Sequence, residues 1–397
     1  SYFPGTSPLH RFDPRLKMAA VIAVSIAVFL ADSTGLIILT VVTGVLLVLS
    51  VPLAEIAFRA LLHLAGRDVI TVLPAEEVLD RAWFRPHPHL VYVFKPENSF
   101  TMDTYGKHKF TVNEYGFRST LDYDIQDIGK PPDTLRIATV GGSTTMGLNN
   151  DNEIWPYLIG RYLSQSIADR TVEVLNEGIM GYTSLDNLLN VATRVIKFDP
   201  DVYVIYLGVN DYLARAPRRI YKPDHSHFRK TLHESLYSSR SQLLPRLVLN
   251  MKLVRGILQL MHVPDNRSLV ANTGTSLFRT LHRIEPDQEL AVEKTLRRSA
   301  VRNVKSMVGM IRIHRPDALI LLSSFYDLDD RRFVTDLNDD FRRLAAELDL
   351  VFVDAANQIP RDRSMAYDYG HFTPEGEKRI GLLFADAILK GLRRKGL

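Results

Sequence analysis

The second half of the chain alternates short apolar segments with longer segments of helical periodicity. Five apolar segments follow residue 134, each three to six residues long, and stretches such as Trp155–Ile167 and Leu185–Phe198 separate them. Buried strands that alternate with helices form a parallel sheet with helices on both faces. The sequence therefore predicts an α/β fold: a three-layer, doubly wound, mainly parallel five-stranded sheet. The predicted strands are Leu135–Val140, Val172–Leu175, Val202–Leu207, Ala318–Leu322 and Val351–Val353.

The composition narrows the classes of function. The chain has 397 residues, of which 46% are hydrophobic and 24% are charged, as is typical of a globular protein with two or three units. It contains no cysteine, so disulfides, thiolate nucleophiles and cysteine-bound metals are excluded. The net charge of +4 comes from short, scattered basic clusters, so we expect no nucleic-acid partner. A mildly basic surface is more consistent with contact to anionic membrane lipid than with binding to nucleic acid.

Two apolar runs near the N-terminus predict attachment to a membrane. A basic tail, 1–17, precedes uncharged runs at 18–31 and 36–54. A helix needs about 20 apolar residues to cross a bilayer, so the second run is long enough and the first is short. We expect 18–64 to form a membrane hairpin or a single anchor; a cleaved signal peptide and a buried core hairpin are the alternatives. The protein would lie at the inner membrane with a cytoplasmic tail, and the number of crossings decides the side of the remaining chain.

The rest of the chain is expected to contain an extension and a catalytic domain. Residues 65–130 form a connecting extension with short strands, because Val91–Phe94 and Lys109–Val112 alternate in polarity. Residues 131–397 form the catalytic domain, interrupted at 214–292 by a helical insert longer than most crossovers. We interpret this insert as a lid or packing element. A membrane-binding or partner-binding helix at Leu243–His262 is the alternative.

Polar side chains follow the predicted strands, at the edge where parallel sheets bind ligands. Ser143 stands on a glycine turn after the first strand, and Gly181 lies on the loop after the second. Asn210 follows the third strand, and Asp368 and His371 stand three residues apart after the last. Each has an ordinary explanation when taken singly, such as a turn for Gly181 and a helix N-cap for Asn210. The turn at Ser143 lacks the lysine of a phosphate-binding loop.

Together these residues have the composition of a site for nucleophilic catalysis. The carboxylate of Asp368 can orient the imidazole of His371, which can accept the hydroxyl proton of Ser143. The N–H groups of Ser143 and Gly181 and the amide of Asn210 can stabilise an oxyanion. This chemistry needs no cofactor.

Other polar groups carry weaker signals. His87 with His89, and His225 with His227, lack carboxylate partners at the spacing of a metal site, so we expect no bound metal. The acidic run that starts at Asp327 lacks the glycine and terminal glutamate of a calcium loop. We expect it to be a solvated turn.

The polar loops resemble the four signature blocks of the SGNH (GDSL-like) hydrolase superfamily, over about residues 133–397. The resemblance implies that Ser143 is the nucleophile and that Asp368 and His371 complete a catalytic triad. It also implies an oxyanion hole formed by Ser143, Gly181 and Asn210.

Three other segments bear on family membership. The nucleophile block reads Gly-Gly-Ser, so Gly142 replaces the family's aspartate, which removes a side chain but no catalytic group. The segment Asn113–Ser119 is similar to the N-terminal extension of membrane-anchored bacterial members. The segment from Pro4 to Lys17 resembles the opening of the transmembrane (T) component of energy-coupling-factor transporters, over about the first 60 residues. The rest of that membrane domain is missing, so transport is not implied.

The resemblance implies a membrane-anchored serine esterase or deacylase that acts through an acyl-enzyme on an ester of a lipid or a cell-envelope glycan. An O-acyltransferase, such as an O-acetyltransferase, would use the same residues. An interaction subunit of a membrane complex with an idle site is the alternative from another class, suggested by the transporter-like tail and the basic insert. The expected partners are the ester substrate, membrane lipid and a membrane protein.

Overall fold

The computed structural model describes residues 54–61, 64, 83–103, 105–216, 221–227 and 286–396. The chain falls into two compact units, Ser1–Ile70 with Asn250–Leu258 and Thr71–Leu249 with Gln259–Leu397. In the first unit, residues 54–61 are helical and Arg59 pairs with Glu55 at 2.6 Å. The fold and the site described below belong to the second unit.

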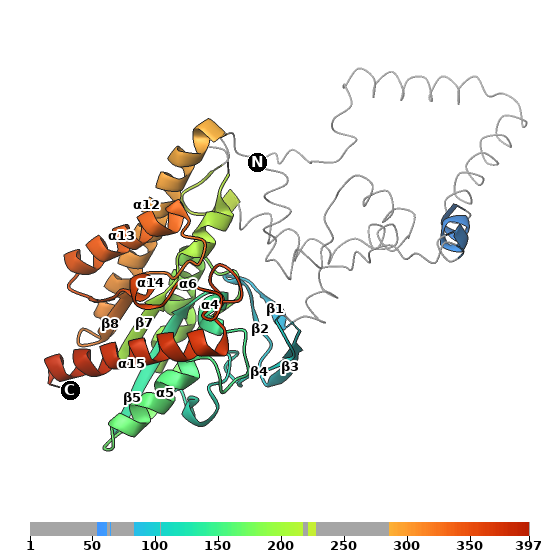
Figure 1. Ribbon diagram of the computed structural model, residues 1–397. Coiled ribbons are helices and arrows are strands. Elements are labelled where there is room, and N and C mark those ends of the chain that lie inside the picture. The colour runs from blue at the N-terminus through green and yellow to red at the C-terminus, as the bar shows by residue number, and fades with distance from the viewer. Residues whose placement is uncertain are drawn as a thin grey trace, which may run out of the picture. The chain divides into compact units, whose positions relative to one another are not determined.

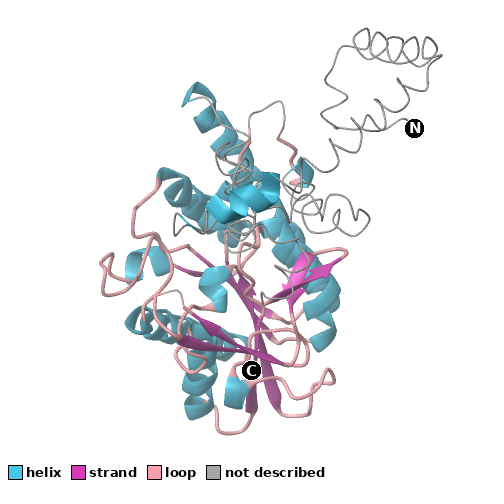
Figure 2. Cartoon of the chain, turned by 90° about the vertical axis from the view of Figure 1, so that its right-hand side faces the viewer, coloured by secondary structure: helices cyan, strands magenta, loops and turns pink. Residues whose placement is uncertain are grey.

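A five-stranded parallel sheet forms the centre of the second unit, as the sequence predicts (Figure 2). The strands lie in the order β6-β5-β7-β8-β9. Strands β5, β7 and β8 are buried along their whole length, which explains their nearly continuous apolar sequences. From β5 the chain runs outward to β6 on one side, and the connection after β6 then passes over β5 to β7 on its other side. The direction in which strands are added to the sheet therefore reverses between β5 and β7. The bounds are β5 Thr134–Gly141, β6 Thr171–Asn176, β7 Val202–Tyr206, β8 Leu319–Ser323 and β9 Val351–Val353.

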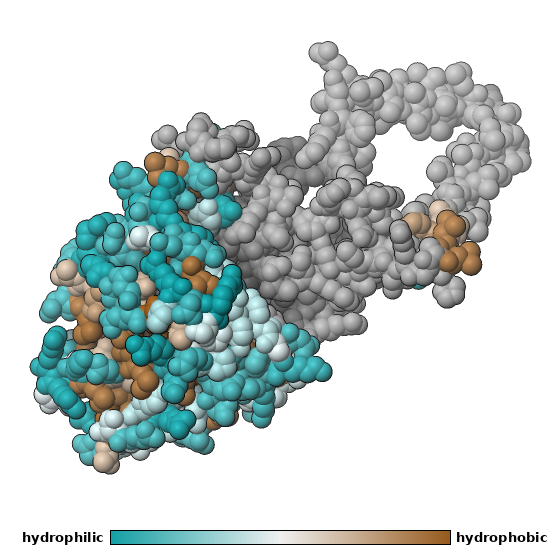
Figure 3. Space-filling model, in the orientation of Figure 1, coloured by the Kyte–Doolittle hydropathy of each residue, from teal (hydrophilic) through white to brown (hydrophobic). Residues whose placement is uncertain are grey.

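Helices cover both faces of this sheet. Helices α5 (Trp155–Ser166) and α15 (Pro374–Lys395) lie side by side on one face (Figure 1). On the other face α12 (Pro286–His314) packs against α6 (Ser184–Asn190) and α13 (Arg332–Glu347). The outer surface in Figure 3 is largely polar over this unit, as expected for helices whose apolar side faces the sheet.

The helix predicted at Leu185–Phe198 is less regular than expected. Helix α6 begins with a capping box, in which Thr183 and Asp186 bond each other's backbone N–H groups, and it ends at Asn190. A π-helical turn, Val191–Val195, and a 3-10 turn, Ile196–Phe198, complete the segment. The apolar pattern thus locates the segment but does not distinguish these three helix types.

The predicted connecting extension forms two antiparallel hairpins. Strand β1 (Phe84–His87) pairs with β2 (Val91–Phe94), and β3 (Asn98–Met102) pairs with β4 (His108–Val112). Beyond the second hairpin, the hydroxyl of Thr120 donates to the carbonyl of Val174 in β6 at 2.8 Å. The extension therefore packs directly on the edge of the central sheet.

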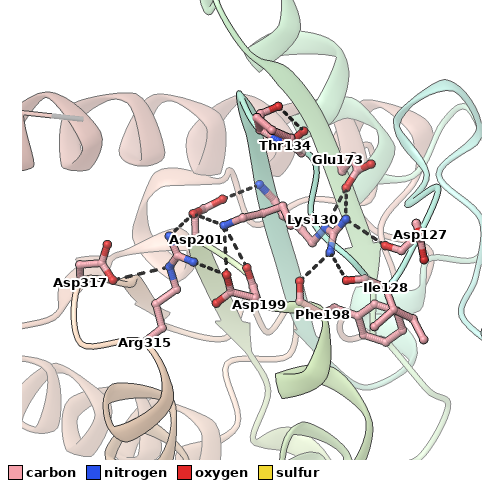
Figure 4. A network of polar contacts seen from close by, with 12 residues as sticks. Asp127, Ile128, Lys130, Thr134, Glu173, Phe198, Asp199, Asp201, Arg315 and Asp317 are labelled. Carbon is pink, nitrogen blue, oxygen red and sulfur yellow. Dashed lines mark hydrogen bonds and ion pairs between the residues drawn. The ribbon is translucent and has the colours of Figure 1, made fainter.

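A polar network ties together the amino ends of the central strands (Figure 4). The buried guanidinium of Arg136 in β5 pairs with Glu173 of β6 at 2.7 Å. The carboxylate of Asp201, just before β7, pairs with Lys130 at 2.7 Å and with Arg315 at 2.6 Å. This network holds the strands at one end of the sheet, and the loops that carry the predicted site leave from the other end.

Several predicted segments lie largely or wholly outside the described residues. These are the basic tail, the two apolar runs apart from residue 54, and the helix at 243–262. Within the described part of the chain, no helix combines the length and the apolar character needed to cross a bilayer. The end of the predicted insert belongs to α12, which spans Pro286–His314. Its buried Val292 and Leu296 lie four residues apart, on the helix face that packs on the core.

Candidate active site

The predicted site residues lie on loops at the carboxyl ends of the strands. Ser143 is the first residue of a short helix, α4 (Ser143–Met146), which directly follows β5. Asn210 lies within a 3-10 helix, Val209–Ala214, which follows β7. The two loops flank the point where the chain changes direction, which is where open α/β sheets bind their ligands. Asp368 and His371 lie on the loop that precedes α15.

The structure brings three of the predicted residues into one line of hydrogen bonds. Nε2 of His371 lies 2.8 Å from Oγ of Ser143, and Nδ1 of His371 lies 2.7 Å from Oδ2 of Asp368. A carboxylate only accepts, so Nδ1 carries the proton and Nε2 accepts from the serine hydroxyl. The arrangement places a base beside the hydroxyl and an anion behind the base.

The loop before α15 holds its own carboxylate in place. Oδ1 of Asp368 accepts the backbone N–H groups of Gly370 and His371, each at 2.9 Å. Burial alone would raise the pKa of Asp368, but the hydrogen bond with His371 and these backbone donors bring that pKa below its usual range. Asp368 is therefore an anion at neutral pH.

The two remaining predicted residues, Gly181 and Asn210, are linked by Tyr182, which follows Gly181 in the chain and is hydrogen-bonded to Asn210. Gly181 has a φ of 76°, a conformation that favours glycine, and it stands directly before Tyr182. The amide of Asn210 donates to the carbonyl of Tyr182 at 3.0 Å. This amide carries a second N–H, which that bond does not use. The helix that contains Asn210 begins after Gly208, so the N-cap explanation of Asn210 was wrong.

The model of the GDSL-like lipase/acylhydrolase family matches residues 139–379, which include all of these loops. The chain belongs to this family. It is therefore a serine hydrolase that acts on ester bonds. The match ends after the start of α15 and begins within β5, so the extension lies outside it.

Solved structures of GDSL-like proteins are similar to this chain. A GDSL-like lipase from Bacteroides thetaiotaomicron is 15% identical, with 65% of this chain and 89% of that chain covered and a TM-score of 0.36. A lipase/acylhydrolase from Enterococcus faecalis is 17% identical, with coverages of 64% and 95% and a TM-score of 0.37. No curated protein matches the sequence.

Two residues of this GDSL-like acylhydrolase that the sequence analysis did not single out come from the extension. Tyr105, between β3 and β4, donates its hydroxyl to Oδ2 of Asp368 at 2.8 Å. Arg118 lies fully buried behind α4. Arg118 falls within Asn113–Ser119, the segment that resembles the extension of family members, so this resemblance could have indicated a functional role for it. No local pattern marks Tyr105, which lies 263 positions from its partner.

Arg118 bonds the backbone at the end of α4, the short helix that begins at Ser143. Its guanidinium donates to the carbonyls of Met146, Gly147 and Asn149, at 3.2, 2.6 and 2.5 Å. It also pairs with the buried carboxylate of Asp151 at 3.1 Å. One side chain of the extension thus satisfies the polar groups of the backbone that leaves α4, as buried groups require.

An open cavity of about 230 Å³ lies at the same edge of the acylhydrolase sheet. Val209, the neighbour of Asn210, contributes to its wall. Arg331, also in the lining, lies over the ring of Tyr369 at 4.2 Å, and that ring is 5.7 Å from the imidazole of His371. The cavity thus lies next to neighbours of the site residues, and none of the predicted site residues lines it. Its lining is Val209, Tyr212, Glu289, Glu293, Arg331, Arg332, Phe333 and Val334.

The histidine pairs considered as metal ligands make other contacts. Nδ1 of His87 accepts the backbone N–H of Leu90 at 3.1 Å, and His227 lies 2.8 Å from the carbonyl of Ala214. Among the described residues, no group of three or more potential ligands comes together.

Proposed function

We propose that this protein is a membrane-attached serine esterase or deacylase that cleaves an ester of a cell-envelope glycan or lipid through an acyl-enzyme. The observation that carries the proposal is the unbroken line from Ser143 through His371 to Asp368, with contacts of 2.8 and 2.7 Å. Nucleophile, base and orienting anion at hydrogen-bond distance are the arrangement that activates a serine.

In the first half-reaction, Oγ of Ser143 attacks the ester carbonyl while Nε2 of His371 accepts the hydroxyl proton. Asp368 stabilises the imidazolium that forms. The imidazolium then donates its proton to the departing alcohol oxygen, and the acyl group stays on Ser143. In the second half-reaction a water gives its proton to Nε2 of His371 and attacks the acyl carbon. The imidazolium then returns this proton to Oγ of Ser143 as the bond from Oγ to the acyl carbon breaks, which releases the acid and restores the serine.

The oxyanion of each tetrahedral intermediate would be stabilised by three N–H donors. These are the backbone N–H groups of Ser143 and Gly181 and the second N–H of the Asn210 amide. The bond from Asn210 to the carbonyl of Tyr182, at 3.0 Å, fixes the amide before substrate arrives. A donor that is already in place is worth roughly 3–4 kcal/mol in the transition state.

The cavity beside the site supports a glycan ester over a long-chain lipid ester. Its volume of about 230 Å³ is below the range usual for pockets that enclose a larger ligand. Its lining includes a hydrogen-bonded pair, Tyr212 with Glu289 at 3.1 Å, and an ion pair, Arg332 with Glu293 at 2.8 Å. Such groups form hydrogen bonds with the hydroxyls of a glycan. A hydrocarbon chain packed against them would instead remove water from their charges, which costs free energy.

Attachment to the inner membrane through residues 18–64 belongs to the same proposal, and its support is the two apolar runs in the sequence. Fractionation of cells that produce the whole chain tests it. We expect the protein to stay with membranes through an alkaline wash, and a variant that lacks residues 1–64 to be released. Release of the whole chain by the wash would contradict attachment.

The substitution Ser143→Ala tests the catalytic proposal. We expect it to abolish hydrolysis of p-nitrophenyl acetate and labelling by a fluorophosphonate probe without lowering the melting temperature. Ser166→Ala removes an equivalent hydroxyl at the exposed end of α5 and serves as the matched control. Equal labelling of Ser143→Ala and the wild type would reject Ser143 as the nucleophile.

Acyl transfer is separated from hydrolysis by one further measurement. The enzyme is incubated with an acetyl donor, with and without a soluble glycan acceptor, and free acetate and acetylated glycan are both quantified. Hydrolysis predicts free acetate in both mixtures. Acetylated glycan as the main product would make the protein an O-acetyltransferase with the same nucleophile. An unlabelled, inactive but folded wild type would favour the interaction-subunit alternative.

A further inference from the structure

The turn between β3 and β4 reaches the loop that carries the proposed triad. Tyr105, on this turn, donates its hydroxyl to Oδ2 of Asp368 at 2.8 Å. The same oxygen accepts Nδ1 of His371 at 2.7 Å. The other oxygen, Oδ1, already accepts two backbone N–H groups. A carboxylate has about four acceptor positions, so these four donors fill it.

Tyr105 is the one donor of the four that comes from outside the loop. The backbone donors belong to Gly370 and His371, and the imidazole is that of His371 itself. A loop that used its own groups alone would leave Oδ2 with a single hydrogen bond. The hydroxyl of Tyr105 therefore restrains Asp368 from a second direction.

The ring of Tyr105 is held as well as its hydroxyl. It stacks on the ring of Tyr367, with centroids 4.7 Å apart and planes 8° from parallel. Tyr367 in turn donates to Oδ1 of Asn149 at 3.0 Å. The backbone of Tyr105 has a φ of 59°, a conformation that residues other than glycine rarely adopt. Such a conformation persists where surrounding contacts hold it, and it is often found at functional sites.

We infer that Tyr105 is a positioning residue of the hydrolase, which acts through Asp368 to fix the orientation and proton affinity of His371. The inference rests on the proposed function. A hydroxyl that donates to Oδ2 stabilises the carboxylate and takes part of its negative charge away from the imidazole. An imidazolium next to the weaker anion releases its proton more readily, so more of the neutral base is present to activate Ser143.

Tyr105 has the protonation state that a hydrogen-bond donor to Asp368 needs. The side chain is 43% exposed; its partial burial, followed by the hydrogen bond to Asp368, raises the pKa of Tyr105 to about 12. The hydroxyl therefore remains a donor throughout the range in which esterases work. Among the described residues, the other ionisable groups around the pair are Arg363, Tyr367 and Tyr369 of the same loop, and His108 of β4, whose Nε2 lies 3.2 Å from the carbonyl of Tyr105.

The substitution Tyr105→Phe removes the hydroxyl and keeps the ring that stacks on Tyr367. We expect the acidic limb of the kcat/KM profile for p-nitrophenyl acetate to move upward by about half a pH unit, because a hydrogen bond of ordinary strength is lost. We expect kcat/KM at neutral pH to fall about three- to tenfold, with KM unchanged and the melting temperature within about 2 °C. Tyr105→Ala, which also loses the stack, should lower the activity further.

A second readout does not depend on activity. Titration of histidine-labelled full-length protein by NMR, with the His371 signal assigned from a His371→Gln variant, should show the His371 midpoint moved upward in Tyr105→Phe. Tyr123→Phe loses a hydroxyl contact with Ser164 at 3.3 Å, away from the site, and should leave both readouts unchanged. Equal midpoints in Tyr105→Phe and wild type would overturn the inference even if activity fell. A wild type without fluorophosphonate labelling would instead reject the proposed function.

Discussion

The amide nitrogen of Asn210 lies 2.5 Å from the place where a Cβ at position 142 would stand, so Asn210 occupies the space that a side chain at Gly142 would need. This distance is far inside van der Waals contact. Asn210 is buried and bonded to Tyr182, so it has little freedom to move away. Gly142 lacks the side chain of the family's aspartate but no catalytic group, and in the structure a side chain at this position would meet Asn210.

Gly142→Ala should therefore reduce turnover by displacing the Asn210 amide from the oxyanion. We expect kcat for p-nitrophenyl acetate to fall about 10²- to 10³-fold, the cost of losing one such donor. Asn210→Ala should give a similar loss, and the double variant should be little worse than either single one. Gly309→Ala, in α12 with nothing within 4 Å of the added carbon, is the matched control. Full activity of Gly142→Ala would show that the added carbon does not displace Asn210, and full activity of Asn210→Ala would show that Asn210 is not the donor.

Arg118→Met should destabilise the hydrolase and disorder the backbone behind Ser143. The change leaves Asp151 buried without its ion-pair partner and removes the donor to four backbone carbonyls. Breaking a buried pair in this way costs about 3–5 kcal/mol, which lowers the melting temperature of a chain of this size by roughly 10 °C. Differential scanning calorimetry measures it. Arg85→Met, at an exposed position of β1, should change the melting temperature by about 1 °C at most. Equal melting temperatures would contradict this role of Arg118.

Glu177→Gln should flatten the dependence of stability on pH. Burial raises the pKa of Glu177 to about 8, and Oε1 of this buried carboxyl has no hydrogen-bond partner among the described residues. The folded protein thus holds a proton that an unfolded glutamate releases at about pH 4.3. Unfolding then releases a proton between these values, so stability is greatest below the lower value and falls as pH rises towards 8.

We expect this group to remove roughly 2 kcal/mol of stability between pH 6 and pH 8 in the wild type, and not in Glu177→Gln. Thermal melts followed by circular dichroism at several pH values measure the difference. Glu347→Gln, at an exposed ion pair with Lys305, is the control and should melt like the wild type. Parallel curves for Glu177→Gln and wild type would show that Glu177 is ionised in the folded protein.

Glu289→Ala tests whether the cavity binds the alcohol part of the substrate. The change removes an exposed acceptor that bonds Tyr212, and it lies away from the triad. We expect KM for an acetylated oligosaccharide to rise about three- to tenfold, the effect of one lost hydrogen bond. Kinetics with p-nitrophenyl acetate, which is too small to fill the cavity, should stay unchanged. Unchanged KM for the oligosaccharide would remove the cavity from the proposed substrate site.

The sheet could be predicted because its strands are buried on both faces. A continuous apolar run such as Val202–Tyr206 has few other places in a globular fold. The site could be predicted because the polar residues follow these strands, and parallel strands end at one edge. The sequence did not reveal where regular helix stops after Asn190, since α and π turns bury the same apolar residues.

The surroundings of single polar side chains were beyond reach of the sequence. Asp327 was expected in a solvated turn, but the side chain is buried and pairs with Arg331, four residues on, at 2.8 Å. The prediction was wrong for this residue because a charged pattern does not show which carboxylate becomes buried. Tyr105 was missed for another reason: its partner Asp368 is distant in the chain.

The hairpin that carries Tyr105 also affects which truncated fragments and which chimeras of such proteins should stay active. The family match spans 139–379, whereas the contacts to Asp368 and to the backbone behind Ser143 start upstream of it. A fragment trimmed to the family match would retain Ser143 and His371 and lack Tyr105 and Arg118. We therefore expect the smallest fully active fragment to begin before β3. Chimeras that exchange the hydrolase domain should keep their rate only when the hairpins are transferred with it.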